Sequence, residues 1–132
     1  MPRSSYKRTS PVSPTGPTRA EQKHAARQHE ADVIAATRRA VFLRDKGCRC
    51  CHSDGRRTDE MHEIQSRAKL RGRPPEEIFN TRNCIRVCRE DHASITGKVG
   101  GDRIRVEPMS AAGADGPVMF WRPPTRGGLA RL

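Results

Sequence analysis

Two short motifs constrain the fold of this chain more than any other feature, because each places two metal-ligating side chains on one tight turn. The first motif is Cys48-x-x-Cys51 and the second is Cys88-x-x-Asp91. Two such pairs can surround one structural zinc ion tetrahedrally and hold a small core together, with the three cysteines as the principal ligands. Asp91 stands where a fourth cysteine would complete the usual set, and oxygen ligates zinc less often than sulfur does. The alternative is a site that has lost its metal and keeps these cysteines as buried thiols.

The composition also limits the chain to a small core. The sequence has 132 residues, of which 33% are apolar and only 4% are aromatic. Such a chain forms at most one modest domain with tails, and domains of this kind often need a metal or disulfides. The chain has five cysteines, an odd number, and residues 1–18 are polar and proline-rich rather than an apolar secretory signal. We therefore expect a protein of the reducing cytoplasm, with no membrane partner and with cysteines used for metal.

The net charge indicates a polyanionic partner. The chain carries 26 lysines and arginines against 15 acidic residues, which gives a formal charge of +11. Arginines occur throughout the sequence, including beside the motifs that carry the candidate chemistry. Arginine presents forked donors that suit phosphate oxygens, so we expect a polyanionic partner. A solvated basic surface without such a partner is the simpler alternative.

A long helix is predicted near the N-terminus, after a disordered basic arm that spans residues 1–18. Residues 20–46 contain no proline or glycine, Thr18 can cap the helix, and Gly47 can end it. Its second half carries an apolar stripe, whereas its first half is nearly all polar. The first half is therefore expected to project from the body or to lie along a partner.

Shorter elements fill the rest of the chain. The predicted pieces are an extended segment at 58–62, a short helix from Pro75 to Phe79, a strand at 83–87, a helix at 89–96, and strands at 103–107 and 118–122. Gly97 is expected to terminate the helix at 89–96. Residues 99–122 would then form a C-terminal β-hairpin, and residues 123–132 a flexible tail.

Five polar residues in the middle of the chain carry the candidate chemistry: His62, Glu63, Arg67, Asn83 and His92. An imidazole can ligate a metal or accept a proton, and an amide can fix a loop without adding charge. The order and spacing of these residues resemble those of the HNH endonuclease family over residues 40–98. The resemblance is carried by Cys48-x-x-Cys51, His62-Glu63-Ile64-Gln65-Ser66-Arg67 and Asn83-Cys84-Ile85-Arg86-Val87-Cys88-Arg89-Glu90-Asp91-His92.

The resemblance implies an α+β fold with a ββα-metal core, in a domain that covers residues 19–98 with the long helix included. It implies one catalytic divalent ion, Mg, Mn, Zn or Ni, held by His62 and His92. In the family, the residue that matches Asn83 orients the site loop or joins the metal shell. Arg67 would clamp the phosphate. The implied activity is hydrolysis of DNA phosphodiesters to a 5′ phosphate and a 3′ hydroxyl, with one strand cut at each centre.

The pair His62-Glu63 departs from the family motif and leaves two interpretations open, because the position of the general-base histidine holds Glu63. In the first interpretation, which the spacing of the motif favours, His62 binds the metal and Glu63 activates water. In the second, His62 is itself the base and the metal rests on His92 and Asn83, with Glu63 as a further ligand. Adjacent residues on a strand point to opposite faces, so both members of the pair could serve one site only across a bulge or sharp twist.

Two alternatives concern the role of the protein. His92 could instead complete a zinc site with Cys48, Cys51 and Cys88, which would make the protein a zinc-stapled DNA-binding module without catalysis. The small, arginine-rich chain is similar to phage-encoded members of the family, so it could be an accessory partner in a DNA-packaging machine of the bacterial host cell. Cutting both strands would require two protomers, as in a homodimer, or two successive events.

Overall fold

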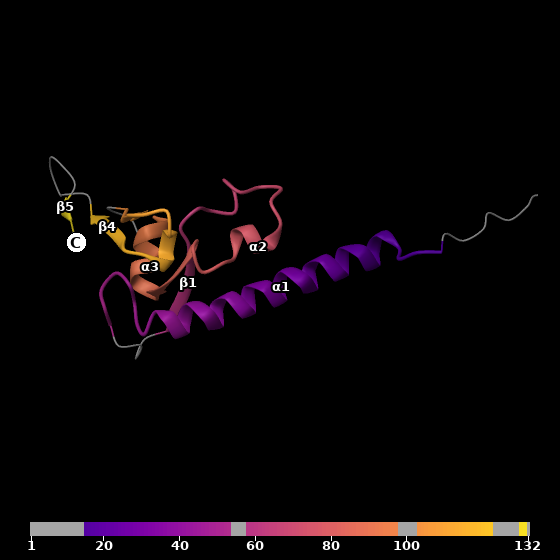
Figure 1. Cartoon of the computed structure of the whole chain (residues 1–132), viewed down its shortest axis with the longest axis horizontal. Coiled ribbons are helices and arrows are strands. Elements are labelled where there is room, and N and C mark those ends of the chain that lie inside the picture. The colour runs from indigo at the N-terminus through magenta and orange to yellow at the C-terminus, as the bar shows by residue number, and fades with distance from the viewer. Residues whose placement is uncertain (1–14, 54–57, 98–102, 123–129, 132) are drawn as a thin grey trace, which may run out of the picture.

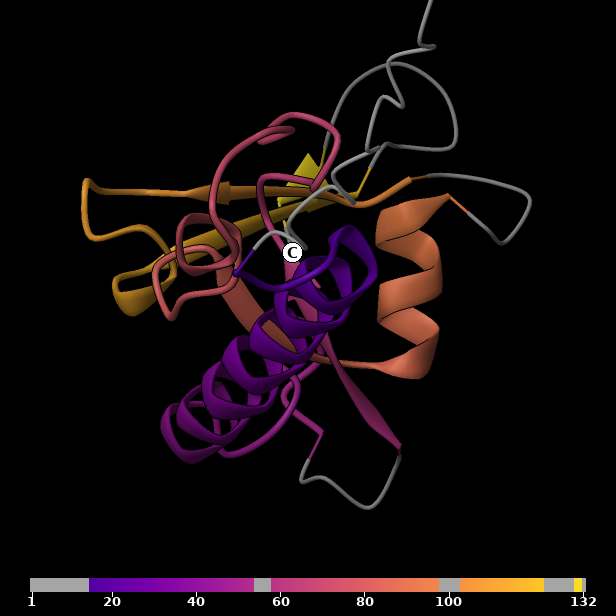
Figure 2. The same cartoon turned by 90° about the vertical axis from the view of Figure 1, so that its right-hand side faces the viewer.

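The computed structural model describes residues 15–53, 58–97 and 103–122 and the backbone of residues 130–131, and within these ranges it has an α+β fold. A long N-terminal helix runs along one side, and two small antiparallel sheets and two short α-helices make up the body (Figures 1 and 2). This arrangement confirms the predicted α+β class and the long helix. Most of the predicted basic arm at residues 1–18 lies outside the described residues. No helix in the described ranges combines the length and apolar character needed to cross a bilayer.

Helix α1 spans Arg19–Arg44 and begins where the sequence predicts. The Thr18 side chain accepts a hydrogen bond from the Glu21 amide, and the Glu21 carboxylate accepts one from the Thr18 amide. This reciprocal capping box satisfies two amides that have no partner inside the helix. The helix ends at Asp45, which is its C-cap, two residues before the predicted glycine.

Only the second half of α1 packs on the body. Thr37 and Val41 are buried, one turn apart, and the Thr37 hydroxyl donates a hydrogen bond of 2.9 Å to the carbonyl of Phe79. Phe79 follows the short helix α2, Pro75–Ile78, which lies beside α1 (Figure 1). These contacts hold α2 and the end of α1 together.

The candidate site lies on a hairpin followed by a helix. Strand β1, Asp59–Glu63, pairs antiparallel with β2, Cys84–Cys88, and the chain passes directly from β2 into helix α3, Arg89–Thr96. The Cys88 sulfur caps α3 by accepting from the amide of Asp91, and Gly97 ends it with a φ of 73°. Glycine suits this left-handed conformation because it has no Cβ to clash with the backbone.

A second sheet is formed by the C-terminal part of the chain. Strands β3, Arg105–Pro108, and β4, Val118–Arg122, form the predicted hairpin, with the short 3-10 helix η1, Gly113–Asp115, between them. Of the predicted flexible tail at 123–132, the structure describes only the backbone of residues 130–131, which forms strand β5, Ala130–Arg131, and pairs with β4. Backbone pairing needs no particular side chains, so the sequence of Ala130 and Arg131 does not indicate a strand.

One small core joins both sheets and α3. Its members come from the loop after α1, from β2, α3 and η1, and from the strands and loops of the second sheet: Cys48, Ile85, Val87, Cys88, Ile95, Ile104, Ala114 and Phe120. The Ala114 amide also donates to the carbonyl of Arg82 at 2.7 Å, which ties η1 to the residues before β2. The body therefore has a shared apolar interior, although that interior is small.

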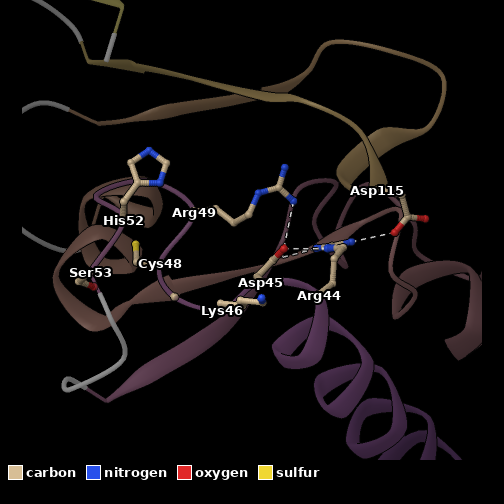
Figure 3. A pocket seen from close by; sticks show the side chains of 9 residues that line it. Arg44, Asp45, Lys46, Cys48, Arg49, His52, Ser53 and Asp115 are labelled. Atoms are coloured by element: carbon tan, nitrogen blue, oxygen red, sulfur yellow. Dashed lines mark hydrogen bonds and ion pairs between the residues drawn. The ribbon is translucent and has the colours of Figure 1, made fainter.

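A buried carboxylate organises the junction between α1 and the body. Asp45 is 5% exposed, and it accepts hydrogen bonds from the guanidinium groups of Arg44 and Arg49 and from the amide of Arg86 (Figure 3). Arg49 continues to the carbonyls of Ala114 and Gly116. A pocket of about 700 Å³ opens beside this network. Arg44 and Arg49, which contribute to the positive charge of the chain, are here partly buried and bind protein groups.

Candidate metal and catalytic site

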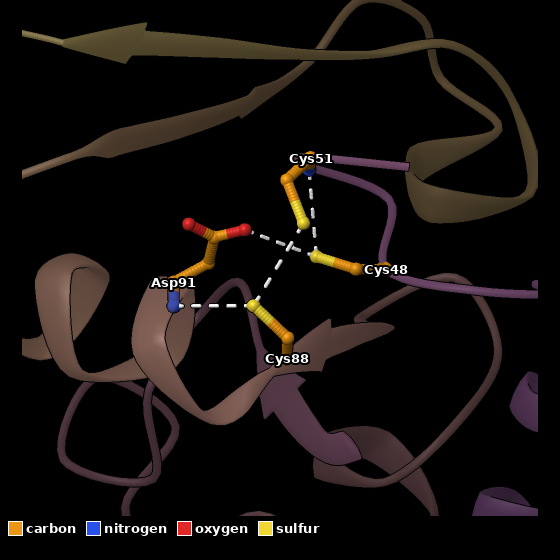
Figure 4. A group of neighbouring side chains, drawn as sticks. All are labelled: Cys48, Cys51, Cys88 and Asp91. Atoms are coloured by element: carbon orange, nitrogen blue, oxygen red, sulfur yellow. Dashed lines mark hydrogen bonds between the residues drawn. The ribbon is translucent and has the colours of Figure 1, made fainter. Parts of the chain in front are cut away.

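A cluster of three thiols and one carboxylate joins the loop after α1 to the start of α3. The ligand atoms of Cys48, Cys51, Cys88 and Asp91 all lie within 4.8 Å of one another (Figure 4). The Cys48 sulfur lies 3.2 Å from an Asp91 oxygen, and the sulfurs of Cys51 and Cys88 are 3.8 Å apart. Two thiolates on one tetrahedral zinc, with bonds of about 2.3 Å, also have sulfurs about 3.8 Å apart. The cluster is therefore close enough to hold a metal ion, as the two sequence motifs predict.

The chemistry of the cluster suits a metal that displaces protons. Burial raises the pKa of the Cys48 and Cys88 thiols, so without a metal they are protonated and can donate hydrogen bonds to Asp91. Burial also acts to raise the pKa of the Asp91 carboxyl, but hydrogen bonds from the three thiols outweigh it and leave this pKa below its usual value. Three soft sulfur donors and one carboxylate oxygen fit zinc, which would bind as the thiols lose their protons.

His92 does not belong to this cluster. It lies on α3 next to Asp91, but its ring faces β1, where Nδ1 shares a hydrogen bond with the carboxylate of Glu60. The predicted alternative, in which His92 completes a zinc site with the cysteines, is therefore not the arrangement in the structure. Asp91 occupies the fourth position instead.

The two histidines predicted to share an ion do lie together. The ring centroids of His62 on β1 and His92 on α3 are 5.2 Å apart, with an angle of 68° between the planes. Two imidazoles on one tetrahedral ion, with bonds of about 2.1 Å, have ring centres about 5 Å apart. The hairpin and helix thus bring these two rings, distant in sequence, within reach of one ion.

The surroundings of His62 favour its neutral form. Burial, followed by the positive charges of His92 and Arg103, lowers the pKa of His62 to about 4. Arg103 is fixed at the end of α3 by a hydrogen bond of 2.8 Å from its Nε to the carbonyl of Ile95. A neutral imidazole has a free ring nitrogen at neutral pH, so His62 can accept a proton or ligate a metal.

Glu60 is a site residue that the sequence interpretation missed. It lies two positions before His62 on β1, so both side chains are on the face of the strand that meets α3. The sequence signal for Glu60 was its position two residues before His62 in an expected extended segment, whereas the family motif pairs His62 with Glu63. Glu60 places a carboxylate oxygen directly beside the ring of His92.

Glu63 and Arg67 lie on the other side of β1. A Glu63 oxygen is 3.5 Å from the Arg67 Nε, and Arg67 also pairs with Glu30 at 3.4 Å. The Arg67 guanidinium is stacked 4.7 Å above the ring of Phe79. Successive strand residues alternate between faces, which accounts for the separation of Glu63 from His62. The structure therefore brings together neither Glu63 nor Arg67 with the two histidines.

Asn83 braces the backbone between the two strands. Its side-chain nitrogen donates to the carbonyls of Gln65 and Ile78 at 3.0 and 2.8 Å, and its oxygen accepts from the Gln65 amide at 2.8 Å. The amide group thus holds the segment that leaves β1 against the segment that enters β2. The family resemblance implies that Asn83 either orients the site loop or joins the metal shell, and these hydrogen bonds correspond to the first of these roles.

Within the part of the chain that the structure describes, only the thiol and carboxylate cluster gathers three candidate ligand atoms within 4.8 Å of one another. The ligand atoms of Glu60, His62 and His92 are therefore not all this close, although Glu60 and His92 are in direct contact. No protein-family model, no curated protein and no solved structure matches this chain.

Proposed function

We propose that this protein is a metal-dependent endonuclease of the HNH type that hydrolyses DNA phosphodiester bonds. The observation that carries the proposal is the convergence of His62 and Glu60 from β1 with His92 from α3. The hairpin-then-helix order is the one that the family resemblance implies. The net charge of +11 supports a polyanionic substrate.

His92 and Glu60 would hold the catalytic ion. Their imidazole and carboxylate are already in contact, which places two donors of suitable type side by side. When bound, a divalent ion would neutralise charge on the phosphate and stabilise the leaving 3′ oxygen. Mg, Mn, Zn and Ni all accept such donors, so the residues leave the identity of the metal open.

His62 would take the proton from the attacking water, the role that the second of the two interpretations gives it, although that interpretation placed the metal on Asn83 and Glu63 beside His92 rather than on Glu60. His62 is neutral at pH 7, as a general base must be, and an approaching phosphate would raise its proton affinity through its negative charge. The water oxygen bonds to phosphorus while the bond to the 3′ oxygen breaks, and the 3′ oxygen takes up a proton from solvent, which leaves a 5′ phosphate and a 3′ hydroxyl. Glu63 has no part in this step because it pairs with Arg67 on the opposite face.

A zinc-stapled DNA-binding module without catalysis is the second candidate function. One observation favours it: the only described group with three ligand atoms close together is the cluster of Cys48, Cys51, Cys88 and Asp91. In that case the two histidines would be a buried polar contact of the hairpin. An accessory role in a DNA-packaging complex is compatible with either activity.

A plasmid-nicking assay with divalent metals added one at a time tests the proposal. We expect wild-type protein to nick supercoiled DNA in at least one metal and His92→Ala to lose this activity while keeping its fold. His62→Asn should slow nicking by roughly 10²- to 10⁴-fold, the usual contribution of a general base. The matched control is Glu63→Gln on the adjacent residue, which should nick at nearly the wild-type rate.

Two results would contradict this assignment. Nicking by His92→Ala at the wild-type rate would remove the proposed ion site. A rate in Glu63→Gln as low as that in His62→Asn would restore the first interpretation, in which Glu63 is the base.

A further inference from the structure

The N-terminal part of α1 makes almost no contact with the body. Residues 19–29 are all exposed, and the first of them to pair with another element is His29, which contacts Glu76 of α2. At about 1.5 Å per residue this stretch is roughly 16 Å long. In Figure 1 it extends away from the rest of the molecule. A segment that buries nothing in the monomer needs another reason to be helical.

Local interactions keep this stretch regular. The capping box at Thr18 and Glu21 fixes its first turn, and Gln28 donates to Asp32 one turn later at 2.9 Å. Alanine, glutamine and arginine, which favour helix, make up most of its sequence. The stretch is therefore a preformed extension of the packed half of α1.

One side of this extension is basic. Arg19, Lys23 and Arg27 follow one another at intervals of four, so they lie on neighbouring turns along one side of the helix. No described residue forms an ion pair with any of the three, and the one acidic side chain among residues 19–29, Glu21, is engaged in the cap. The preceding sequence, residues 1–18, adds three more basic residues and no acidic one.

We propose that this basic face binds the sugar-phosphate backbone of duplex DNA, as a second contact outside the cutting site. Cations at intervals of four residues are about 6 Å apart along a helix, close to the axial separation of alternate phosphates on one strand, about 6.8 Å. The choice of DNA rests on the proposed function, but the contact itself requires no catalysis.

The composition of the extension argues against a protein partner at the same face. Residues 19–29 contain no valine, leucine, isoleucine, methionine or aromatic residue apart from two histidines. Protein interfaces usually depend on large apolar or aromatic anchors, whereas nonspecific DNA binding depends on cations and released counterions. The extension has the cations that nonspecific DNA binding needs and lacks the large apolar or aromatic anchors of a protein interface.

The test is the salt dependence of binding by the full-length protein to a short fluorescent DNA duplex, without added divalent ion. The variant carries Arg19→Gln, Lys23→Gln and Arg27→Gln. If all three side chains contact phosphates, the slope of log K against log salt should fall by about 2 to 3, at about 0.9 for each contact. Circular dichroism checks that the variant keeps its helix content.

The matched control loses the same charge elsewhere, through Arg39→Gln, Arg73→Gln and Arg105→Gln. All three arginines are exposed, and two of them pair with neighbouring glutamates. The control should keep the wild-type slope. An unchanged slope in the first variant, or an equal fall in the control, would overturn the proposal. Because nicking is measured separately, absence of nicking with a reduced slope would reject the nuclease and support the docking face.

Discussion

At the residue scale, the protonation of His62 follows from what surrounds it. The ring is largely buried between β1 and α3, and the charged groups that lower its pKa are His92 and Arg103. Burial and positive charge both disfavour the imidazolium, so the pKa falls to about 4 from an ordinary value of 6.5. The same shift that makes His62 available as a base also links it to folding stability.

The metal-free protein should lose stability as the pH falls from about 6.5 to about 4, the ordinary and folded pKa values of His62. Between these values the unfolded chain binds the proton and the folded one does not, so acid favours unfolding. At about 1.4 kcal/mol per pKa unit, the loss amounts to at most about 3 kcal/mol. Urea denaturation at several pH values measures it. His62→Asn should flatten the dependence in this window, and an equally steep profile in that variant would refute the assigned pKa.

The sequence could predict the two histidines but not the full set around them. His62 and His92 were identified by spacing, and they do meet. Glu63 was placed with His62 because they are adjacent in the motif, yet strand alternation turns it toward Arg67. Glu60 could have been proposed from the same alternation. The partners of Arg67 were not predictable, since Glu30 comes from a distant helix.

At the element scale, the thiol and carboxylate cluster adds to the contacts between the loop after α1 and the β2–α3 segment, such as the hydrogen bond from the Arg49 amide to the carbonyl of Arg86. Cys48 and Cys51 follow α1, whereas Cys88 and Asp91 belong to the junction of β2 and α3. An ion in the cluster would fix α3, and with it His92, against the loop after α1. Metal binding would therefore stabilise both the fold and the position of His92, the proposed ligand of the catalytic ion.

Asp91→Cys should bind zinc more tightly than the wild type, because thiolate is a better zinc ligand than carboxylate. We expect an increase of roughly tenfold or more, measured by competition with a chromophoric chelator, and a higher melting temperature of the zinc-loaded protein. Asp91→Ala, which removes the fourth donor, should show the opposite changes. If neither substitution altered zinc affinity, Asp91 would not be a ligand.

Elements with strong local signals were predicted closely. The first residue of α1 and both ends of α3 agree with the sequence; the capping Thr18 marks the start of α1 and Gly97 marks the end of α3. The end of α1 was placed too late, since Asp45 is drawn into contacts with Arg44, Arg49 and Arg86. Those contacts involve α1, the loop after it and β2, so helix propensity along α1 alone could not predict them.

At the scale of the whole molecule, the small core and the high positive charge together explain where the polar and basic side chains lie. The core is small, and two polar groups supplement it: the buried ion network at Asp45, and the cluster of thiols and a carboxylate at Cys48, which is close enough to hold a metal. The net charge of +11 is distributed between arginines that bind protein groups and others that remain exposed, such as those of the α1 extension. The composition predicts a polyanionic partner, but only the fold shows which arginines bind protein groups and which remain exposed.

The most direct test of the central claim is a count of Mn²⁺ ions bound by protein whose cysteine cluster is already loaded with zinc. We predict that the wild type binds one Mn²⁺ per chain and that a protein carrying Glu60→Gln and His92→Ala binds none, with its zinc content unchanged. Equal Mn²⁺ binding by the two proteins would contradict the account, because the ion site would then lie away from the contact of Glu60 with His92.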